Sequence, residues 1–142
     1  MDYTEKIKYL SQLKDSNAML KSLLEEREKW FTLATKVNTV SDGMPHSPSE
    51  ESKVENNSIR ILELNEKIDE EIKHMVDVRW EIGELISHIQ NVRHRTVMSM
   101  RYISGYTFPR IAEALEISDR AVFKIHRMAV NRLEIHGRKK NV

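Results

Sequence analysis

The sequence predicts an all-α protein in which two long, coiled-coil-like helices precede three short helices. Charged residues make up 32% of the chain, and only four glycines and three prolines occur among 142 residues, a composition that favours helices. Apolar residues recur at helical spacing over residues 3–37 and 58–90. Three shorter amphipathic segments follow at about 94–103, 108–115 and 119–134, separated by capping and turn residues.

The first long helix has a broad apolar stripe. Two of the eight positions in its heptad trace are polar. A second apolar edge lies beside this trace, and a stripe of that width is typical of a helix packed on more than one neighbour. This breadth favours a homodimer of four helices, with a hairpin inside one chain as the alternative. The trace comprises Leu10, Leu13, Asn17, Leu20, Leu24, Arg27, Phe31 and Ala34, and the second edge comprises Leu23, Trp30 and Leu33.

Residues 38–57 differ from the segments on either side. Serine, asparagine, proline and glycine cluster there, and apolar residues nearly vanish. Such a composition indicates a linker or a flexible loop. We therefore expect residues 1–90 to form one helical hairpin or coiled-coil region, interrupted by this linker.

The second long helix has a cleaner seam with two polar breaks, Asn65 and Arg79. Polar residues inside such seams either fix the register or face water where the seam frays. Trp30 and Trp80 are predicted to be buried anchors of the helical region. The seam comprises Ile61, Asn65, Ile68, Ile72, Met75, Arg79, Ile82, Ile86 and Ile89.

Residues 91–142 predict a separate domain of three short helices. Gly105 can end the first of them in a left-handed conformation, and Thr107 is placed to cap the second, with Pro109 in its first turn. Ser118 is an N-cap for the third, because its hydroxyl can accept a hydrogen bond from a free amide. The connection between the last two helices is about three residues long and suits the steep crossing of a helix-turn-helix.

The last helix is predicted to have one buried face and one reading face. Val122, Ile125, Ala129 and Leu133 recur on one side. In a helix-turn-helix the second helix enters the major groove of double-stranded DNA, and its N-terminal residues meet base edges. The outward candidates are Ser118, Asp119, Arg120, Phe123, Lys124 and Arg127, with His126 predicted on the flank, against backbone phosphate.

The charge distribution supports DNA binding by this domain. Residues 91–142 hold 11 Lys and Arg against 4 Asp and Glu, whereas residues 1–90 hold 12 against 18. A basic domain is what phosphate contacts require. Arg110 and Arg127 are expected to hold phosphates. A basic tail can add further contacts, although it can equally serve solubility; it comprises Arg138, Lys139 and Lys140.

The stretch from Arg93 to Leu133 resembles region 4 of sigma-70 factors, the module that reads the promoter −35 element. The resemblance lies in RHRTVMSMRYISG, IAEAL and ISDRAVFKIHRMAVNRL. It implies that Arg120, Phe123 and Lys124 contact bases. Phe123 departs from the basic residue often found at its position, and Glu116 departs from the glycine common at the turn. The wider pattern resembles small regulators of Gram-positive phages and mobile elements, which include late-gene transcription activators.

These observations lead to the hypothesis of a sequence-specific DNA-binding transcription regulator, of the activator type. RNA polymerase, a second copy or a regulatory protein is the expected partner of the helical front half. The alternative is a protein-interaction module that binds RNA polymerase or another regulator without reading DNA. A purely structural coiled-coil adaptor is a third reading, against which the basic C-terminal domain argues.

Other functions have little support in the sequence. The chain has no cysteine, which fits a reducing cytoplasm. The resemblance to phage regulators implies that this is the cytoplasm of a bacterial host cell. No apolar run approaches the ~20 residues of a membrane span. The six histidines show no zinc-binding spacing, and the common nucleotide-binding and hydrolase motifs are missing. We therefore expect no enzyme activity, no cofactor, no metal site and no membrane partner.

Overall fold

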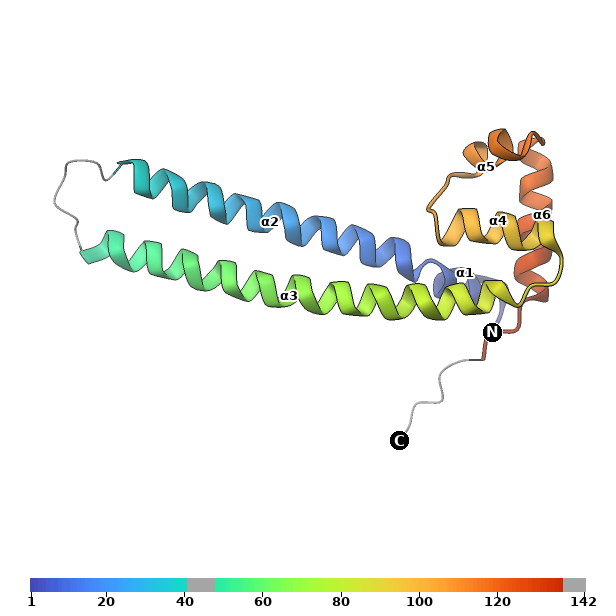
Figure 1. The fold of residues 1–142 in the computed structure, drawn as a ribbon, viewed down its shortest axis with the longest axis horizontal. Coiled ribbons are helices and arrows are strands. Elements are labelled where there is room, and N and C mark those ends of the chain that lie inside the picture. Colours follow the sequence, from blue (N-terminus) through green and yellow to red (C-terminus); the bar gives the residue numbers. More distant parts are fainter. Residues whose placement is uncertain (41–47, 137–142) are drawn as a thin grey trace. The chain divides into compact units, whose positions relative to one another are not determined.

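The computed structural model describes residues 1–40 and 48–136, with residues 37–40 and 48–54 described by their backbone alone. It confirms the all-α class, since the described residues contain helices and no strand (Figure 1). The helices are α1 (Tyr3–Leu10), α2 (Gln12–Val40), α3 (Pro48–Ser87), α4 (Val92–Tyr102), α5 (Phe108–Leu115) and α6 (Asp119–Arg132).

Two predicted boundaries in the front half were wrong. The helix predicted over 3–37 is divided at Ser11, where α1 ends and α2 begins one residue later. In the linker predicted over 38–57, residues 38–40 and 48–57 are helical, and residues 41–47 lie outside the described residues. The polar sequence from Pro48 can begin α3, because proline is well tolerated in the first turn of a helix.

The chain divides into two compact units. One comprises Met1–Asp15 and Met75–Val142, and the other comprises Ser16–His74. We call them the head unit and the hairpin unit. Helices α2 and α3 each contribute residues to both units, a division that the hydrophobic periodicity of these helices does not reveal.

In the hairpin unit, segments of α2 and α3 run side by side in opposite directions (Figure 1). Arg27 donates a hydrogen bond of 2.9 Å from Nη1 to Oδ1 of Asn65, so this polar break in the seam joins the two helices. Leu64 and Ile68 are buried. The predicted seams are only partly buried, because two helices alone leave much of each surface open. The exposed apolar residues of the two heptad traces are Leu24, Phe31 and Ile72.

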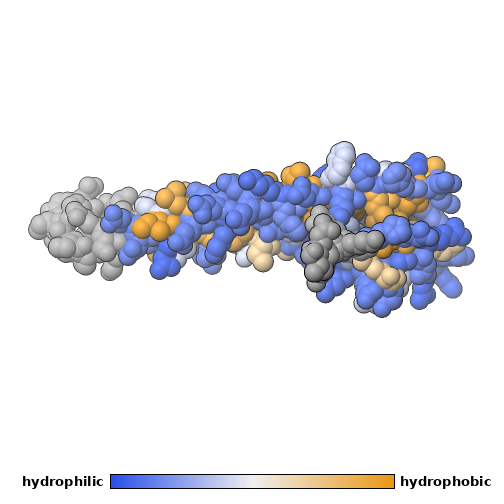
Figure 2. Space-filling model, turned by 90° about the horizontal axis from the view of Figure 1, so that it is seen from below, coloured by the Kyte–Doolittle hydropathy of each residue, from blue (hydrophilic) through white to orange (hydrophobic). Residues whose placement is uncertain are grey.

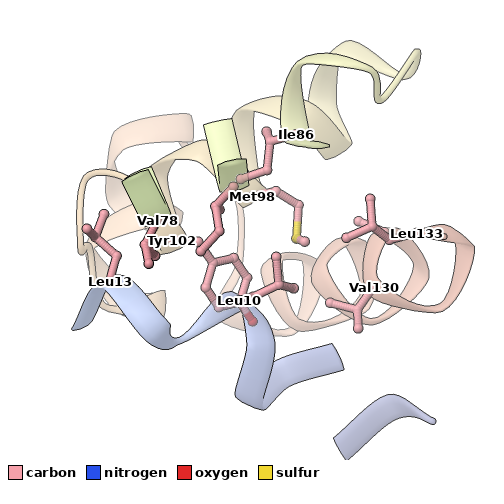
Figure 3. Packing of buried hydrophobic residues seen from close by; sticks show 10 residues of the cluster. Leu10, Leu13, Val78, Ile86, Met98, Tyr102, Val130 and Leu133 are labelled. Carbon is pink, nitrogen blue, oxygen red and sulfur yellow. The ribbon is translucent and has the colours of Figure 1, made fainter. Parts of the chain in front are cut away.

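The main core of the head unit is built by residues from α1, α2, α3, α4 and α6. Figure 3 shows apolar side chains from these helices converging, with the ring of Tyr102 among them. Burial of this apolar surface is the main force that holds these helices together. The buried members of this cluster are Leu10, Leu13, Val78, Ile82, Ile86, Met98, Tyr102, Ala129, Val130 and Leu133.

Trp80 is not part of this core, and the prediction of a buried anchor was wrong. Its side chain is 72% exposed. On α3, Val78, Ile82 and Ile86 recur every four residues and face the core. Because each helical residue is rotated by about 100° from the one before it, Trp80 points about 200° away from Val78.

On the face that Figure 2 shows, hydrophilic residues predominate and apolar residues form smaller patches between them. Within the described ranges, none of the helices combines the length and the apolar character that crossing a membrane would need.

Candidate nucleic-acid interface

Helix α5 is held by a local cap and by its buried face. The hydroxyl of Thr107 accepts a hydrogen bond of 3.3 Å from the backbone N–H of Arg110, as the sequence predicts, and the preceding Gly105 is left-handed, with φ of 74°. Ile111 and Ala112 are buried. They form a second core cluster with Val97 of α4 and Val122 of α6, which ties the three helices together.

The connection from α5 to α6 consists of Glu116, Ile117 and Ser118. Glu116 is left-handed, with φ of 55° and ψ of 43°. This conformation lets the N–H of Ile117 donate to the carbonyl of Ala112 at 3.0 Å, closing the end of α5. The hydroxyl of Ser118 then accepts a hydrogen bond of 3.1 Å from the N–H of Ala121, so α6 begins with the predicted N-cap.

One face of α6 is buried. Val122 and Ala129 lie in the core as predicted, whereas Ile125 is partly buried. His126 also belongs to this face, so the prediction that it flanks the helix and contacts phosphate was wrong. It is only 5% exposed, and its Nε2 lies 2.6 Å from the hydroxyl oxygen of Tyr102, a hydrogen bond whose donor depends on the imidazole tautomer.

The Tyr102–His126 pair is held in its uncharged form. Burial, and secondarily the nearby Arg101 guanidinium, lowers the pKa of His126 from 6.5 to about 4. Burial raises the pKa of Tyr102 above its ordinary value. The pair is therefore a structural element between α4 and α6, and it gives the domain no cation at neutral pH.

The opposite face of α6 carries three exposed cations. Arg120, Lys124 and Arg127 occupy positions i, i+4 and i+7, which places them on one side of the helix. Ser118 and Asp119 are exposed at its N-terminus. Phe123 lies on the edge of this face. The structure thus brings together six of the candidate residues that the sequence singles out: Ser118, Asp119, Arg120, Phe123, Lys124 and Arg127.

The ring of Phe123 packs against other aromatic groups. Its side chain is 52% exposed, and its ring centroid lies 4.9 Å from that of Phe108. Phe108 in turn meets the ring of His126 edge-on at 5.0 Å. The Arg101 guanidinium carbon lies 4.1 Å from the centre of the Phe108 ring, on the ring's face. Phe108 was missed in the sequence, where its only signal is an aromatic residue directly after the cap Thr107.

The remaining candidates have different surroundings. Arg110 is exposed at the start of α5, and its guanidinium carbon lies 3.8 Å from the centre of the Tyr106 ring. Arg101 and Arg95 use their guanidinium groups inside the unit, donating to the carbonyls of Tyr106 and Ile89 at 3.1 and 3.0 Å. The tail residues Arg138, Lys139 and Lys140 lie outside the described residues.

Within α6, Asp119 at the N-terminus is the one carboxylate beside this basic face. In the part of the chain that the structure describes, no group of three or more His, Asp or Glu side chains is arranged to hold a metal ion. Glu113 and Glu116 are the exposed carboxylates of α5 and the turn. The arrangement is suited to binding an anionic polymer through Arg120, Lys124 and Arg127.

Comparison with known proteins gives a family but no activity. No curated protein and no solved structure matches the chain. A family model described as "Protein of unknown function (DUF1492)" matches residues 47–134, which is more than half of the 142 residues. The match extends from the start of α3 through the end of α6. The chain therefore belongs to the DUF1492 family.

Proposed function

We propose that α4, α5 and α6 form a helix-turn-helix domain and that the protein is a sequence-specific DNA-binding transcription regulator. The observation that carries this proposal is the two-sided character of α6: Arg120, Lys124 and Arg127 are exposed on one face, and the other face is buried against α4 and α5. The short connection with left-handed Glu116 and the cap Ser118 supports the helix-turn-helix arrangement.

In this proposal α6 enters the major groove with its N-terminus toward the bases. Arg120 donates two hydrogen bonds to a guanine edge, and Lys124 reaches a base or a phosphate. Phe123, whose ring lies against that of Phe108, packs on a thymine methyl group. Arg127 and Arg110 hold phosphates, and Ser118 and Asp119 lie at the entry of the helix.

The resemblance to sigma-70 region 4 supports a role at promoters. On that basis the protein acts as an activator of phage or mobile-element genes and works beside RNA polymerase. The basic tail, Arg138, Lys139 and Lys140, adds phosphate contacts. The helical front half binds a partner, which is a second copy, RNA polymerase or a regulatory protein.

Duplex binding as a function of salt tests this proposal. Each phosphate contact makes the logarithm of the association constant fall by about 0.9 per unit of log salt concentration. Replacing Arg120 and Lys124 by alanine should therefore weaken binding, measured by fluorescence anisotropy, and lower the salt slope by up to about 2.

The matched control removes the same charge elsewhere. Lys67 and Lys73 are exposed on α3, and their joint replacement by alanine changes the net charge equally. We expect this control to bind duplex like the wild type. Equal losses in the two double variants would show that binding follows net charge, and would contradict the assignment of α6.

A second function is favoured by one observation, the half-exposed Phe123 on the reading face. An aromatic side chain with an apolar support is also a common anchor in protein interfaces. The alternative is a module that binds RNA polymerase or another regulator without reading DNA. The test is whether the immobilised protein retains purified polymerase. Retention that is lost in Phe123→Ala would favour this function, provided that the protein shows no salt-sensitive binding to duplex DNA.

A further inference from the structure

An open groove lies between α3 and α4 of the head unit, away from the proposed reading face. It encloses about 760 Å³, and its lining includes Val76, Trp80 and Gly83 of α3 with Met100 and Ile103 of α4. Val76 and Trp80 are 59% and 72% exposed. An exposed tryptophan at the rim of an apolar groove is typical of a protein-binding surface.

Gly83 lies in the middle of α3, where glycine destabilises a helix relative to alanine. Nothing in the described part of the chain requires it, because a Cβ atom built at Gly83 would meet no described atom within 4 Å. Its φ is not positive, so the backbone does not require it either. A glycine with open space above it allows another body to approach the helix backbone closely.

The exposed face of α3 at this groove follows coiled-coil spacing. Val76, Trp80, Gly83 and Ser87 are separated by four, three and four residues, which are the core positions of a heptad repeat. Val76, Gly83 and Ser87 are small or of moderate size, so they leave space beside the indole ring of Trp80. This face is distinct from the buried face of α3 that carries Val78, Ile82 and Ile86.

Opposite charges flank this face. Arg79 and Arg95 line the groove together with Glu84. Helical spacing separates the charges of α3: Arg79, one residue before Trp80, lies on one flank of the stripe, and Glu84, one residue after Gly83, lies on the opposite flank. The other side of Trp80 is a second open depression, about 740 Å³ in volume, whose lining includes Asp77 and Glu84. Within the chain, Oε2 of Glu84 lies 4.0 Å from Nε2 of His88. A basic side and an acidic side along one stripe make the surface complementary to itself.

We propose that a second copy of this chain occupies the groove, with the two α3 helices parallel about a two-fold axis. In a parallel pair the two flanks of one helix meet the opposite flanks of its partner, so Arg79 of each chain, five residues before Glu84, faces Glu84 of the other. An antiparallel pair would instead bring like flanks together, with Glu84 near Asp77. The charges therefore select the parallel direction.

The core of this interface is formed by Trp80, which enters a hole that includes Gly83 of the second copy. The same patch is used by both chains, as a two-fold interface requires. This interaction does not depend on DNA binding, since none of its residues belongs to the reading face. The contact is small, so we expect reversible dimers at higher protein concentrations.

Charge exchange tests the proposal directly. In sedimentation velocity of the full chain at low salt, the wild type should shift reversibly from monomer to dimer with concentration. Arg79→Glu and Glu84→Arg each bring like charges together and should weaken association by about tenfold or more. Arg79→Glu combined with Glu84→Arg should restore it. A wild type that stays monomeric, single variants that associate normally, or a double variant no better than the singles would overturn the proposal.

Gly83→Ala gives a second test, because it should raise the thermal stability of the monomer and weaken the association of two chains. Because the added Cβ meets no atom of the described residues, the thermal midpoint of the dilute monomer should rise by about 2–4 °C. The same methyl group narrows the hole for Trp80 and should reduce association about tenfold. Trp80→Ala should also reduce it, whereas Val92→Ala, an exposed apolar residue of α4 outside the groove, should not. Unchanged association in Gly83→Ala would contradict the interface.

Discussion

At the scale of single residues, the ends of helices depend on local contacts, and the surroundings of a large side chain depend on how its helix packs. Thr107 and Ser118 cap α5 and α6 as their side-chain chemistry indicates, because a cap involves only atoms within three residues. His126 and Trp80 were assigned to the wrong environments. Both are amphipathic side chains, and whether such a residue is buried depends on which way its helix faces, which spacing alone does not determine.

Glu116 provides the first test at this scale. Among the described residues it is the one non-glycine residue with positive φ, and a left-handed conformation is costly for a side chain with a Cβ. Glu116→Gly should raise the free energy of unfolding by up to about 1 kcal/mol, measured by urea denaturation. Glu116→Ala removes the same carboxylate but keeps the Cβ, so it should bring no such gain. Equal effects of the two variants would contradict this explanation.

His126 predicts a dependence of stability on pH. Its pKa is about 4 in the folded chain and 6.5 ordinarily, so between these values the unfolded chain binds the additional proton. The contribution of uncharged His126 to the free energy of unfolding is fully present above pH 6.5 and is lost as the pH falls toward 4. The slope is up to about 1.4 kcal/mol per pH unit for each such histidine.

The measurement is a series of urea denaturation curves between pH 7 and pH 4.5. Burial, and secondarily Arg132, also lowers the pKa of His94, so His126→Gln should remove part of the slope and leave the remainder. His136→Gln, which removes an exposed imidazole instead, is the matched control. An undiminished slope in His126→Gln would show that the Tyr102–His126 pair is not the sensor.

At the scale of the helices, the short C-terminal elements were predicted more accurately than the long ones. The bounds predicted for α5 are those observed, because a cap and a turn residue delimit it on both sides. The beginning of α3 was misplaced by ten residues, because a polar helix has no apolar periodicity to reveal it. The break at Ser11 was missed for a different reason: the apolar stripe continues across it, from Leu10 to Leu13.

The two faces of α5 give a prediction at this scale. Ile111 is fully buried in the cluster shared with Val97 and Val122, whereas Glu113 is exposed two residues later. Ile111→Ala should lower the free energy of unfolding by about 2–5 kcal/mol, because it leaves a cavity where α4, α5 and α6 meet. Glu113→Ala should change it by less than about 0.5 kcal/mol. Urea denaturation checks both, and a similar small effect in the two variants would contradict the shared core.

At the scale of the whole chain, the near-neutral net charge of +1 conceals an uneven distribution. The sequence shows that residues 91–142 are basic, with 11 Lys and Arg against 4 Asp and Glu. The sequence did not reveal which of these cations stay free for a ligand. Arg95 and Arg101 are engaged with backbone carbonyls, and Arg120, Lys124 and Arg127 are exposed together. Whether a cation is engaged or exposed depends on tertiary contacts between residues from different elements.

The central claim is that α6 reads a DNA sequence, and selection from a pool of random duplexes by the purified full chain tests it most directly. At physiological salt, where nonspecific phosphate binding is weak, the wild type should enrich a defined motif. The variant with Arg120→Ala and Lys124→Ala should lose this motif, and the variant with Lys67→Ala and Lys73→Ala should retain it. Enrichment of no motif by the wild type, or of the same motif by the α6 variant, would contradict the claim.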